Sequence, residues 1–162
     1  MARVYVSVGS NIDPGKNIRS CLTALHRRYG ELIVSSVYES KAIGFDGDNF
    51  YNLVVGFDTE DGVHAVAQVL RAIEHEHGRT RAERRFCSRT LDLDLLLYGD
   101  AVLRENGLEL PRADILRHAF VLRPLAEIAG HERHPVDQRR YAELWDAFDK
   151  TTQALWPAEL PP

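Results

Sequence analysis

The segment that decides the fold of this chain reads Arg89-Thr90-Leu91-Asp92-Leu93-Asp94-Leu95-Leu96-Leu97-Tyr98-Gly99-Asp100. Its continuous apolar run is typical of a buried strand. Side chains two residues apart in a strand point to the same face, so Asp92 and Asp94 must project together. Adjacent carboxylates repel each other, and burying either one without a partner is costly. Spacing alone leaves two interpretations open: a Mg²⁺ site, or a charged strand end that is exposed or neutralised by an arginine such as Arg89.

Composition describes an ordinary globular protein. The chain has 162 residues, of which 44% are hydrophobic and 27% are charged, so we expect one domain spanning residues 1–162. The formal net charge of −4 argues against a nucleic-acid partner. The arginines are nevertheless concentrated ahead of the acidic pair, at Arg71, Arg79, Arg81, Arg84, Arg85 and Arg89. A basic cluster of this kind in an acidic protein suits a compact anionic ligand.

The sequence also predicts where the protein works. Its two cysteines, Cys21 and Cys87, lie in no metal-binding spacing, so a disulfide framework is not expected and a reducing cytoplasm is the default location. The chain shows no targeting segment, and no apolar run approaches the roughly 20 residues that span a bilayer. We expect a cytoplasmic protein without membrane association, and a monomer, with a weak dimer as the alternative.

The predicted strands and helices that precede Asp92 and Asp94 follow one another in a regular order. Hydrophobic periodicity predicts strands at 3–8, 31–38, 50–57 and 91–98, and helices at 18–29 and 63–78. The charged, aperiodic stretch 79–88 is predicted to be a functional loop. The resulting order β-α-β-β-α-β predicts an α+β fold with a ferredoxin-like core. C-terminal helical additions follow: a short piece opened by Pro111 and a final helix over 137–148, before a proline-rich end that we expect to fray.

Three sequence elements then carry a resemblance: Val8-Gly9-Ser10-Asn11, Gly78-Arg79 and Ser88-Arg89-Thr90-Leu91-Asp92-Leu93-Asp94. In this order and at these intervals they resemble the 6-hydroxymethyl-7,8-dihydropterin pyrophosphokinase family of folate biosynthesis, over about residues 3–130. The resemblance implies a ferredoxin-like α+β core, ATP as co-substrate, two Mg²⁺ ions and a dihydropterin. It also implies transfer of pyrophosphate from ATP to the hydroxymethyl group, which gives the pterin diphosphate and AMP.

The resemblance assigns residues on the nucleotide side of the site. Asp92 and Asp94 would hold two Mg²⁺ ions that bridge the phosphates of ATP, as in a two-metal clamp. Arg79 and Arg89 match the catalytic arginines, whose guanidinium groups bind phosphate oxygens and do not lose their proton. The full set of nucleotide-binding positions is Glu74, Arg79, Arg81, Arg89, Leu95, Arg112 and His118.

A second group of positions corresponds to the pterin side. Asn52 matches the asparagine that hydrogen-bonds the heterocycle, and an amide is suited to this because it both donates and accepts. Phe50 and Phe120 match the aromatic pair that encloses the ring. The full set of pterin-binding positions is Ser40, Ile43, Gly44, Phe50, Asn52, Asp92 and Phe120.

The chain also departs from the family pattern. Pro111-Arg112-Ala113 stands where the family usually has Pro-His-Tyr, and His118 stands where an arginine is frequent. Lys41, Phe86 and Cys87 replace a common proline, tryptophan and glycine. Two alternatives stay open. The departures favour a divergent paralogue that acts on a related pterin or another hydroxymethyl heterocycle. A non-catalytic nucleotide- or pterin-binding module would be expected to lose the metal ligands or the arginines, and this sequence retains both.

Overall fold

A computed structural model describes residues 1–42, 47–78 and 90–162, and the structural statements below concern these residues. The elements follow in the order β1 (Ala2–Ser10), α1 (Pro14–Tyr29), β2 (Ile33–Val34), β3 (Tyr38–Ser40), β4 (Phe50–Thr59), α2 (Val63–Glu76), β5 (Asp92–Tyr98), β6 (Leu103–Glu105), β7 (Leu108–Leu110), α3 (Asp114–Arg117), α4 (Ala119–Ala129), α5 (Tyr141–Ala147) and β8 (Leu155–Pro157). The chain therefore has an α+β fold, as predicted.

One antiparallel sheet organises these elements. Its strand order is β5-β1-β4-β3-β8, and β2 also pairs with β4. The two long strands β1 and β4 lie side by side, with Ala2 opposite Thr59 and Ser10 opposite Tyr51. Strands β6 and β7 form a separate hairpin.

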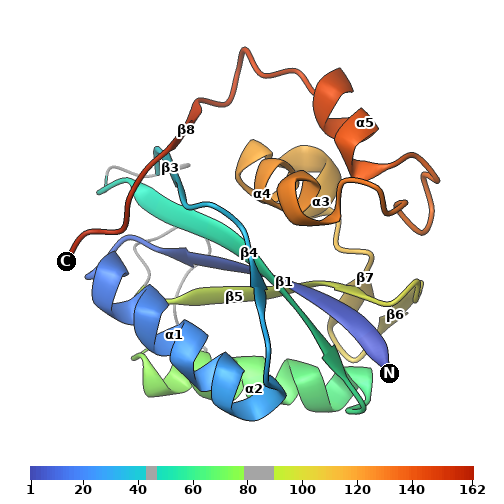
Figure 1. Cartoon of the computed structure of the whole chain (residues 1–162), viewed down its shortest axis with the longest axis horizontal. Coiled ribbons are helices and arrows are strands. Elements are labelled where there is room, and N and C mark those ends of the chain that lie inside the picture. Colours follow the sequence, from blue (N-terminus) through green and yellow to red (C-terminus); the bar gives the residue numbers. More distant parts are fainter. Residues whose placement is uncertain (43–46, 79–89) are drawn as a thin grey trace.

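Helices cover both faces of the sheet (Figure 1). On one face α1 and α2 pack against alternate residues of the strands, among them Val6, Val55 and Leu93. On the other face α3, α4 and α5 pack against the residues in between, among them Val54 and Leu96. Both faces are buried because alternate strand residues point to opposite sides, and both sets are apolar along the middle of the strands.

Three sequence predictions are corrected by this fold. The second predicted strand, 31–38, is two short strands, β2 and β3, which both pair with β4. The hairpin β6–β7 was not anticipated, because its strands have only three residues each. The final helix begins at Tyr141 rather than near residue 137.

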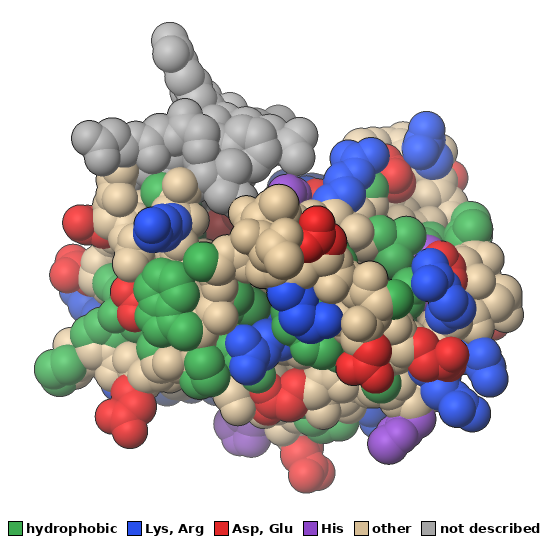
Figure 2. Space-filling model, turned by 90° about the horizontal axis from the view of Figure 1, so that it is seen from above, with side chains coloured by type: hydrophobic (Ala, Val, Ile, Leu, Met, Phe, Trp, Pro, Cys, Tyr) green, Lys and Arg blue, Asp and Glu red, His purple; other side chains and the backbone are tan. Residues whose placement is uncertain are grey.

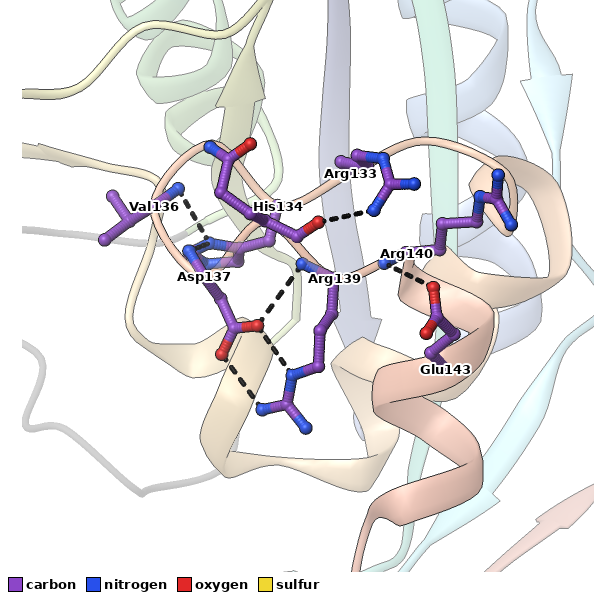
Figure 3. A network of polar contacts seen from close by, with 8 residues as sticks. Arg133, His134, Val136, Asp137, Arg139, Arg140 and Glu143 are labelled. Carbon is purple, nitrogen blue, oxygen red and sulfur yellow. Dashed lines mark hydrogen bonds and ion pairs between the residues drawn. The ribbon is translucent and has the colours of Figure 1, made fainter.

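The loop ahead of α5 explains the late start of that helix (Figure 3). His134 is buried, and its Nδ1 accepts hydrogen bonds from the backbone N–H groups of Val136 and Asp137, at 3.1 and 3.0 Å. The Asp137 carboxylate in turn accepts 2.7 and 3.0 Å hydrogen bonds from the Arg139 guanidinium. These contacts hold residues 134–139 in a compact turn, so the helix can begin only after it. Burial lowers the pKa of His134, which therefore stays neutral as the acceptor.

The C-terminal segment is ordered, contrary to the prediction that it frays. Strand β8 pairs with β3, and the next residue, Ala158, donates its N–H to the Val37 carbonyl at 3.0 Å. Further on, Leu160 packs against the core, and the Arg19 guanidinium on α1 donates to the Pro161 carbonyl at 2.7 Å. Backbone pairing and side-chain burial thus outweigh the local tendency of a proline-rich terminus to stay disordered.

No described helix combines the length and the apolar character needed to cross a membrane. Figure 2 shows the molecule from the side of β8 and α5, and on its described surface acidic and basic side chains are interspersed.

Gly56 provides a test of the packing between β1 and β4. It lies opposite Tyr5, and a Cβ atom at this position would come within 2.7 Å of the buried Tyr5 ring. We expect Gly56→Ala to destabilise the fold by about 1–3 kcal/mol, because the ring would have to shift within a close-packed interior. Urea unfolding followed by circular dichroism measures the difference, and an unchanged midpoint would show that the ring moves freely.

Candidate functional site

The predicted pterin and metal residues meet on one row across three strands. Gly9 on β1 lies directly opposite Asn52 on β4, and on its other side it lies opposite Asp92 on β5. Directly opposed residues of antiparallel strands point to the same face, so Asn52 and Asp92 flank Gly9. A Cβ at Gly9 would lie 3.3 Å from Oδ1 of Asn52. A Cβ at Gly9 would also lie 3.9 Å from Cδ1 of Phe50, so glycine at this position lets the Asn52 and Phe50 side chains lie close to the backbone of β1.

The acidic pair lies on the face covered by α3, α4 and α5. Asp92 and Asp94 are both partly exposed, and they share a face with Leu96, which packs against those helices. Burial raises the pKa of Asp94 above its ordinary value, and the negative charge of Asp92 raises it further. Asp114 and Glu74 make smaller contributions in the same direction, whereas the positive charge of Arg112 lowers this pKa. Among the described residues that act on Asp94, three carboxylates therefore raise its pKa and the Arg112 guanidinium lowers it.

A bound cation would relieve the repulsion between the neighbouring carboxylates of Asp92 and Asp94. Among residues 1–42, 47–78 and 90–162 no group of three or more histidine, cysteine or acidic side chains is arranged to hold a metal ion. Mg²⁺ in phosphate-transfer sites is usually bound through one or two carboxylates, with phosphates and water completing its octahedron. The pair Asp92 and Asp94 fits a metal that arrives with phosphates, and not a site built entirely from protein ligands.

Arg112 connects this acidic pair to a third carboxylate. Nη2 of Arg112 lies 3.2 Å from Oδ1 of Asp94, and its Nε lies 3.0 Å from Oδ2 of Asp114. The other oxygen of Asp114, Oδ1, lies 3.9 Å from Nε2 of His118. The His118 ring is stacked on Phe120, with 5.0 Å between centroids. Two ion pairs, a longer contact to His118 and a ring stack therefore connect Asp94 to Phe120, an aromatic residue predicted on the pterin side.

The pterin residues of β3 and β4 lie at the same end of the sheet. Asn52 is 3% exposed, and its Nδ2 donates to Oγ of Ser40 at 2.9 Å and to the Tyr38 carbonyl at 3.4 Å. Phe50 is two residues away from Asn52 on β4 and points to the same face. Helix α4, which carries Phe120, packs against β3 and β4. The fold thus brings Ser40, Phe50, Asn52 and Phe120 to one side of the sheet.

Two nucleotide-side predictions have unexpected surroundings. Glu74 on α2 accepts a hydrogen bond from the backbone N–H of Leu93 at 2.8 Å, which ties that helix to the edge strand beside the acidic pair. Leu95 is 5% exposed, in the core between the sheet and helices α1 and α2. Its side chain points away from the face of Asp94, so any contact with a nucleotide would have to use its backbone.

Five predicted site residues lie outside the described residues: Ile43, Gly44, Arg79, Arg81 and Arg89. Their roles stay predictions from the sequence. Described site residues lie close to them in the sequence. Ser40 ends β3 shortly before residues 43–46, and Asp92 begins β5 shortly after residues 79–89.

A further group of contacts near the site was not anticipated. The Glu127 carboxylate on α4 accepts hydrogen bonds from the Tyr38 hydroxyl at 2.6 Å and from the Ser36 N–H at 2.8 Å. The Arg123 guanidinium, one turn earlier on α4, lies 4.7 Å from the centroid of the Tyr38 ring. Together these contacts fix α4 against β3, and hence Phe120 relative to Ser40. No local sequence pattern could reveal them, because the partners are far apart in the chain.

The chain is similar in sequence to known proteins of one family. Residues 5–130 match the model of the 7,8-dihydro-6-hydroxymethylpterin-pyrophosphokinase family. A Pseudomonas aeruginosa protein named 2-amino-4-hydroxy-6-hydroxymethyldihydropteridine pyrophosphokinase is 40% identical over 146 residues, which cover 88% of this chain and 89% of that protein. A Haemophilus influenzae protein of the same name is 37% identical over 134 residues, covering 80% and 83% respectively.

Solved structures show the same fold. The Plasmodium falciparum HPPK-DHPS structure with SDX-DHP matches 90% of this chain with a TM-score of 0.70 at 13% sequence identity. The match covers 43% of the Plasmodium chain, so this chain corresponds to less than half of that protein. At this identity the likeness concerns the fold alone.

Proposed function

This chain belongs to the 7,8-dihydro-6-hydroxymethylpterin-pyrophosphokinase family, and from that membership we propose how its residues carry out the reaction. The protein transfers pyrophosphate from ATP to the hydroxymethyl group of 6-hydroxymethyl-7,8-dihydropterin. The hydroxymethyl oxygen attacks the β-phosphorus of ATP, the bond from that phosphorus to the α,β-bridging oxygen breaks, and AMP leaves. The hydroxyl proton is released to solvent, and the products are the pterin diphosphate and AMP.

The main structural support for this assignment is that Asn52, Gly9 and Asp92 lie side by side on three neighbouring strands. This arrangement supports a heterocycle held by the Asn52 amide on one side of Gly9 and phosphates held near Asp92 and Asp94 on the other. The attacking oxygen and the phosphorus would then approach each other near Gly9, where the lack of a side chain lets the substrates lie close to β1. Holding two reactants in this way removes much of the entropic barrier to their reaction.

The remaining chemistry rests on charge. Two Mg²⁺ ions, when bound with ATP, would neutralise the phosphates, and Asp92 and Asp94 are the residues that would hold them. Arg79 and Arg89 are proposed to stabilise the charge that develops during transfer, with Arg81, Arg112 and His118 adding positive charge around the nucleotide. We assign no general base, so positioning and electrostatics account for the rate.

On the pterin side, Phe50 and Phe120 would enclose the ring, and Ser40, Ile43 and Gly44 would line its edge. The neighbouring strand order, β5-β1-β4 with β2 and β3 on β4, supports a ferredoxin-like core within a single domain. We further propose that the protein acts in the cytoplasm as a monomer.

One assay tests the proposed reaction directly. AMP should be released from ATP and Mg²⁺ only when 6-hydroxymethyl-7,8-dihydropterin is present. Mass spectrometry of the products from several pterins distinguishes this substrate from that of a divergent paralogue. Absence of AMP with every pterin would instead indicate a binding module.

Asn52→Ala should weaken pterin binding and spare ATP binding. The lost amide hydrogen bonds should raise the KM for the pterin by about 10–100-fold, as expected for one or two hydrogen bonds in a shielded site. The KM for ATP should stay within about twofold. Asn49→Ala is the matched control, because Asn49 lies just before β4, three residues ahead of Asn52, but donates its Nδ2 to Glu39 at 3.0 Å. Equal effects of the two substitutions on the pterin KM would contradict the assignment.

A further inference from the structure

Arg112 stands where the family usually has a histidine. Its backbone N–H donates to the Leu96 carbonyl at 3.0 Å, which fixes it beside β5, two residues along that strand from Asp94. A histidine at this place could lose its proton, whereas a guanidinium keeps its charge at every physiological pH. Arg112 therefore places a permanent positive charge next to the metal pair.

The guanidinium is held between two carboxylates. Nη2 lies 3.2 Å from Oδ1 of Asp94, and Nε lies 3.0 Å from Oδ2 of Asp114. The exposed fractions of these side chains are 37% for Arg112, 26% for Asp94 and 15% for Asp114, so the contacts are partly shielded from water. Shielding strengthens the interaction between charges.

This contact conflicts with a metal at the same carboxylate. A Mg²⁺ ion on Asp94 would share its oxygen with the Arg112 guanidinium or displace it, and the two cations repel each other. Arg112 cannot relieve the repulsion by losing a proton, so it must move. Its contact with Asp114 through Nε can persist while Nη2 leaves Asp94, and phosphate oxygens are the natural acceptors for the freed Nη group.

We propose that Arg112 is an internal counterion of Asp94 that competes with Mg²⁺ in the nucleotide-free protein and transfers to the phosphates when Mg²⁺ arrives with ATP. The inference rests on the proposed function, because it takes Asp94 as a metal ligand. It assigns Arg112 two opposite effects. Without nucleotide it opposes the metal, and with nucleotide it favours the ternary complex. The result is a site that takes up Mg²⁺ together with ATP and resists the free ion.

Arg112→Gln separates the two effects. Mn²⁺ serves as the probe, since the free ion gives an electron paramagnetic resonance signal that disappears on binding. Without nucleotide, Mn²⁺ should bind Arg112→Gln about tenfold more tightly than the unsubstituted protein, the order expected for removing one nearby positive charge. With the α,β-methylene analogue of ATP, which cannot be cleaved at the reacting bond, the sign should reverse, and the variant should bind the Mn²⁺ complex about tenfold more weakly.

Two variants control the experiment. Arg104→Gln removes the same charge from the neighbouring hairpin, where Arg104 is 81% exposed and pairs only weakly with Glu109 at 3.4 Å, so both affinities should stay unchanged. Arg112→Lys keeps the charge and should bind free Mn²⁺ as weakly as the unsubstituted protein. Circular dichroism checks that each variant is folded.

The outcomes are distinct. Opposite changes with and without nucleotide, confined to Arg112→Gln, support the proposal. Unchanged or weaker Mn²⁺ binding by nucleotide-free Arg112→Gln overturns it, and if Asp94→Asn still abolishes Mn²⁺ binding, the metal site itself stands. Unchanged Mn²⁺ binding in Asp94→Asn, with and without the analogue, overturns the proposal and the metal assignment together.

Discussion

Asp94→Asn should abolish turnover and, at the same time, stabilise the nucleotide-free fold at neutral pH. Turnover should fall on the order of 10³-fold or more, because a metal ligand that neutralises the transferred phosphates contributes several kcal/mol to the transition state. The gain in stability has a separate origin. Asp94 is a partly buried carboxyl beside Asp92, and the fold holds its charged form at a cost.

The cost of ionising Asp94 determines how the stability of the fold changes with pH. Burial and the charge of Asp92 raise the pKa of Asp94 in the folded protein to about 7, whereas an unfolded aspartate has a pKa near about 4. Between these values the folded protein binds a proton that the unfolded chain does not, so stability falls as pH rises from about 4 to about 7. The full penalty of ionising Asp94 is present above that window. Asparagine carries no such penalty.

Thermal unfolding without metal or nucleotide measures the effect. We expect the Tm of Asp94→Asn to exceed that of the unsubstituted protein by about 2–4 °C for each kcal/mol of penalty removed, at pH 8 and not at pH 4. Asp100→Asn, in the exposed turn after the same strand, is the charge-matched control and should leave turnover intact. Near-normal AMP release by Asp94→Asn would refute the metal assignment.

Arg89→Ala should lower kcat by about 10³-fold while changing pterin affinity by no more than about twofold. An arginine that contacts the transferring group acts mainly on the transition state, so its removal affects kcat more than ground-state binding. Arg89 lies outside the described residues, three positions ahead of Asp92, and the expectation comes from its place in the sequence motif. Single-turnover kinetics with equilibrium binding of the pterin separate the two quantities.

A control for Arg89→Ala is available in the same arginine-rich segment. Arg84→Ala removes an equal charge from a position that matches no catalytic residue of the family, and its kcat should stay within about threefold of the unsubstituted value. Arg89→Lys should recover only part of the loss, because an ammonium group lacks the planar pair of donors that a phosphate accepts. A collapse of pterin affinity in Arg89→Ala would show that Arg89 has a different role.

The sequence was sufficient for features that depend on local periodicity. The strand over β5 follows from its apolar run, and the two-residue spacing requires Asp92 and Asp94 to share a face. The helix α1 follows in the same way from Ile18, Cys21 and Leu25, which are all buried. The order of elements followed from these periodicities, and the α+β class from that order.

Features that depend on long-range contacts could not be predicted. The pairing of β8 with β3 joins segments from opposite parts of the chain, and a three-residue strand has too few positions to show a period. The contact of Arg112 with Asp94 depends on how the chain returns after β7, which no spacing encodes. The position of Gly9 between Asn52 and Asp92 could be recognised only with the strand register known, because a glycine near a strand end is otherwise typical of a turn.

The C-terminal strand has a consequence for how copies of the protein behave toward one another. Without β8, strand β3 would present a row of backbone N–H and C=O groups along an unpaired edge. Such an edge is a template onto which another chain can add a strand, and it is a common starting point for aggregation. By pairing with β3, the last residues of the chain cover this edge and replace it with β8, a three-residue strand that ends in a proline. A short edge strand with a proline offers few groups to another chain, so we expect the terminal segment to limit aggregation in addition to extending the sheet.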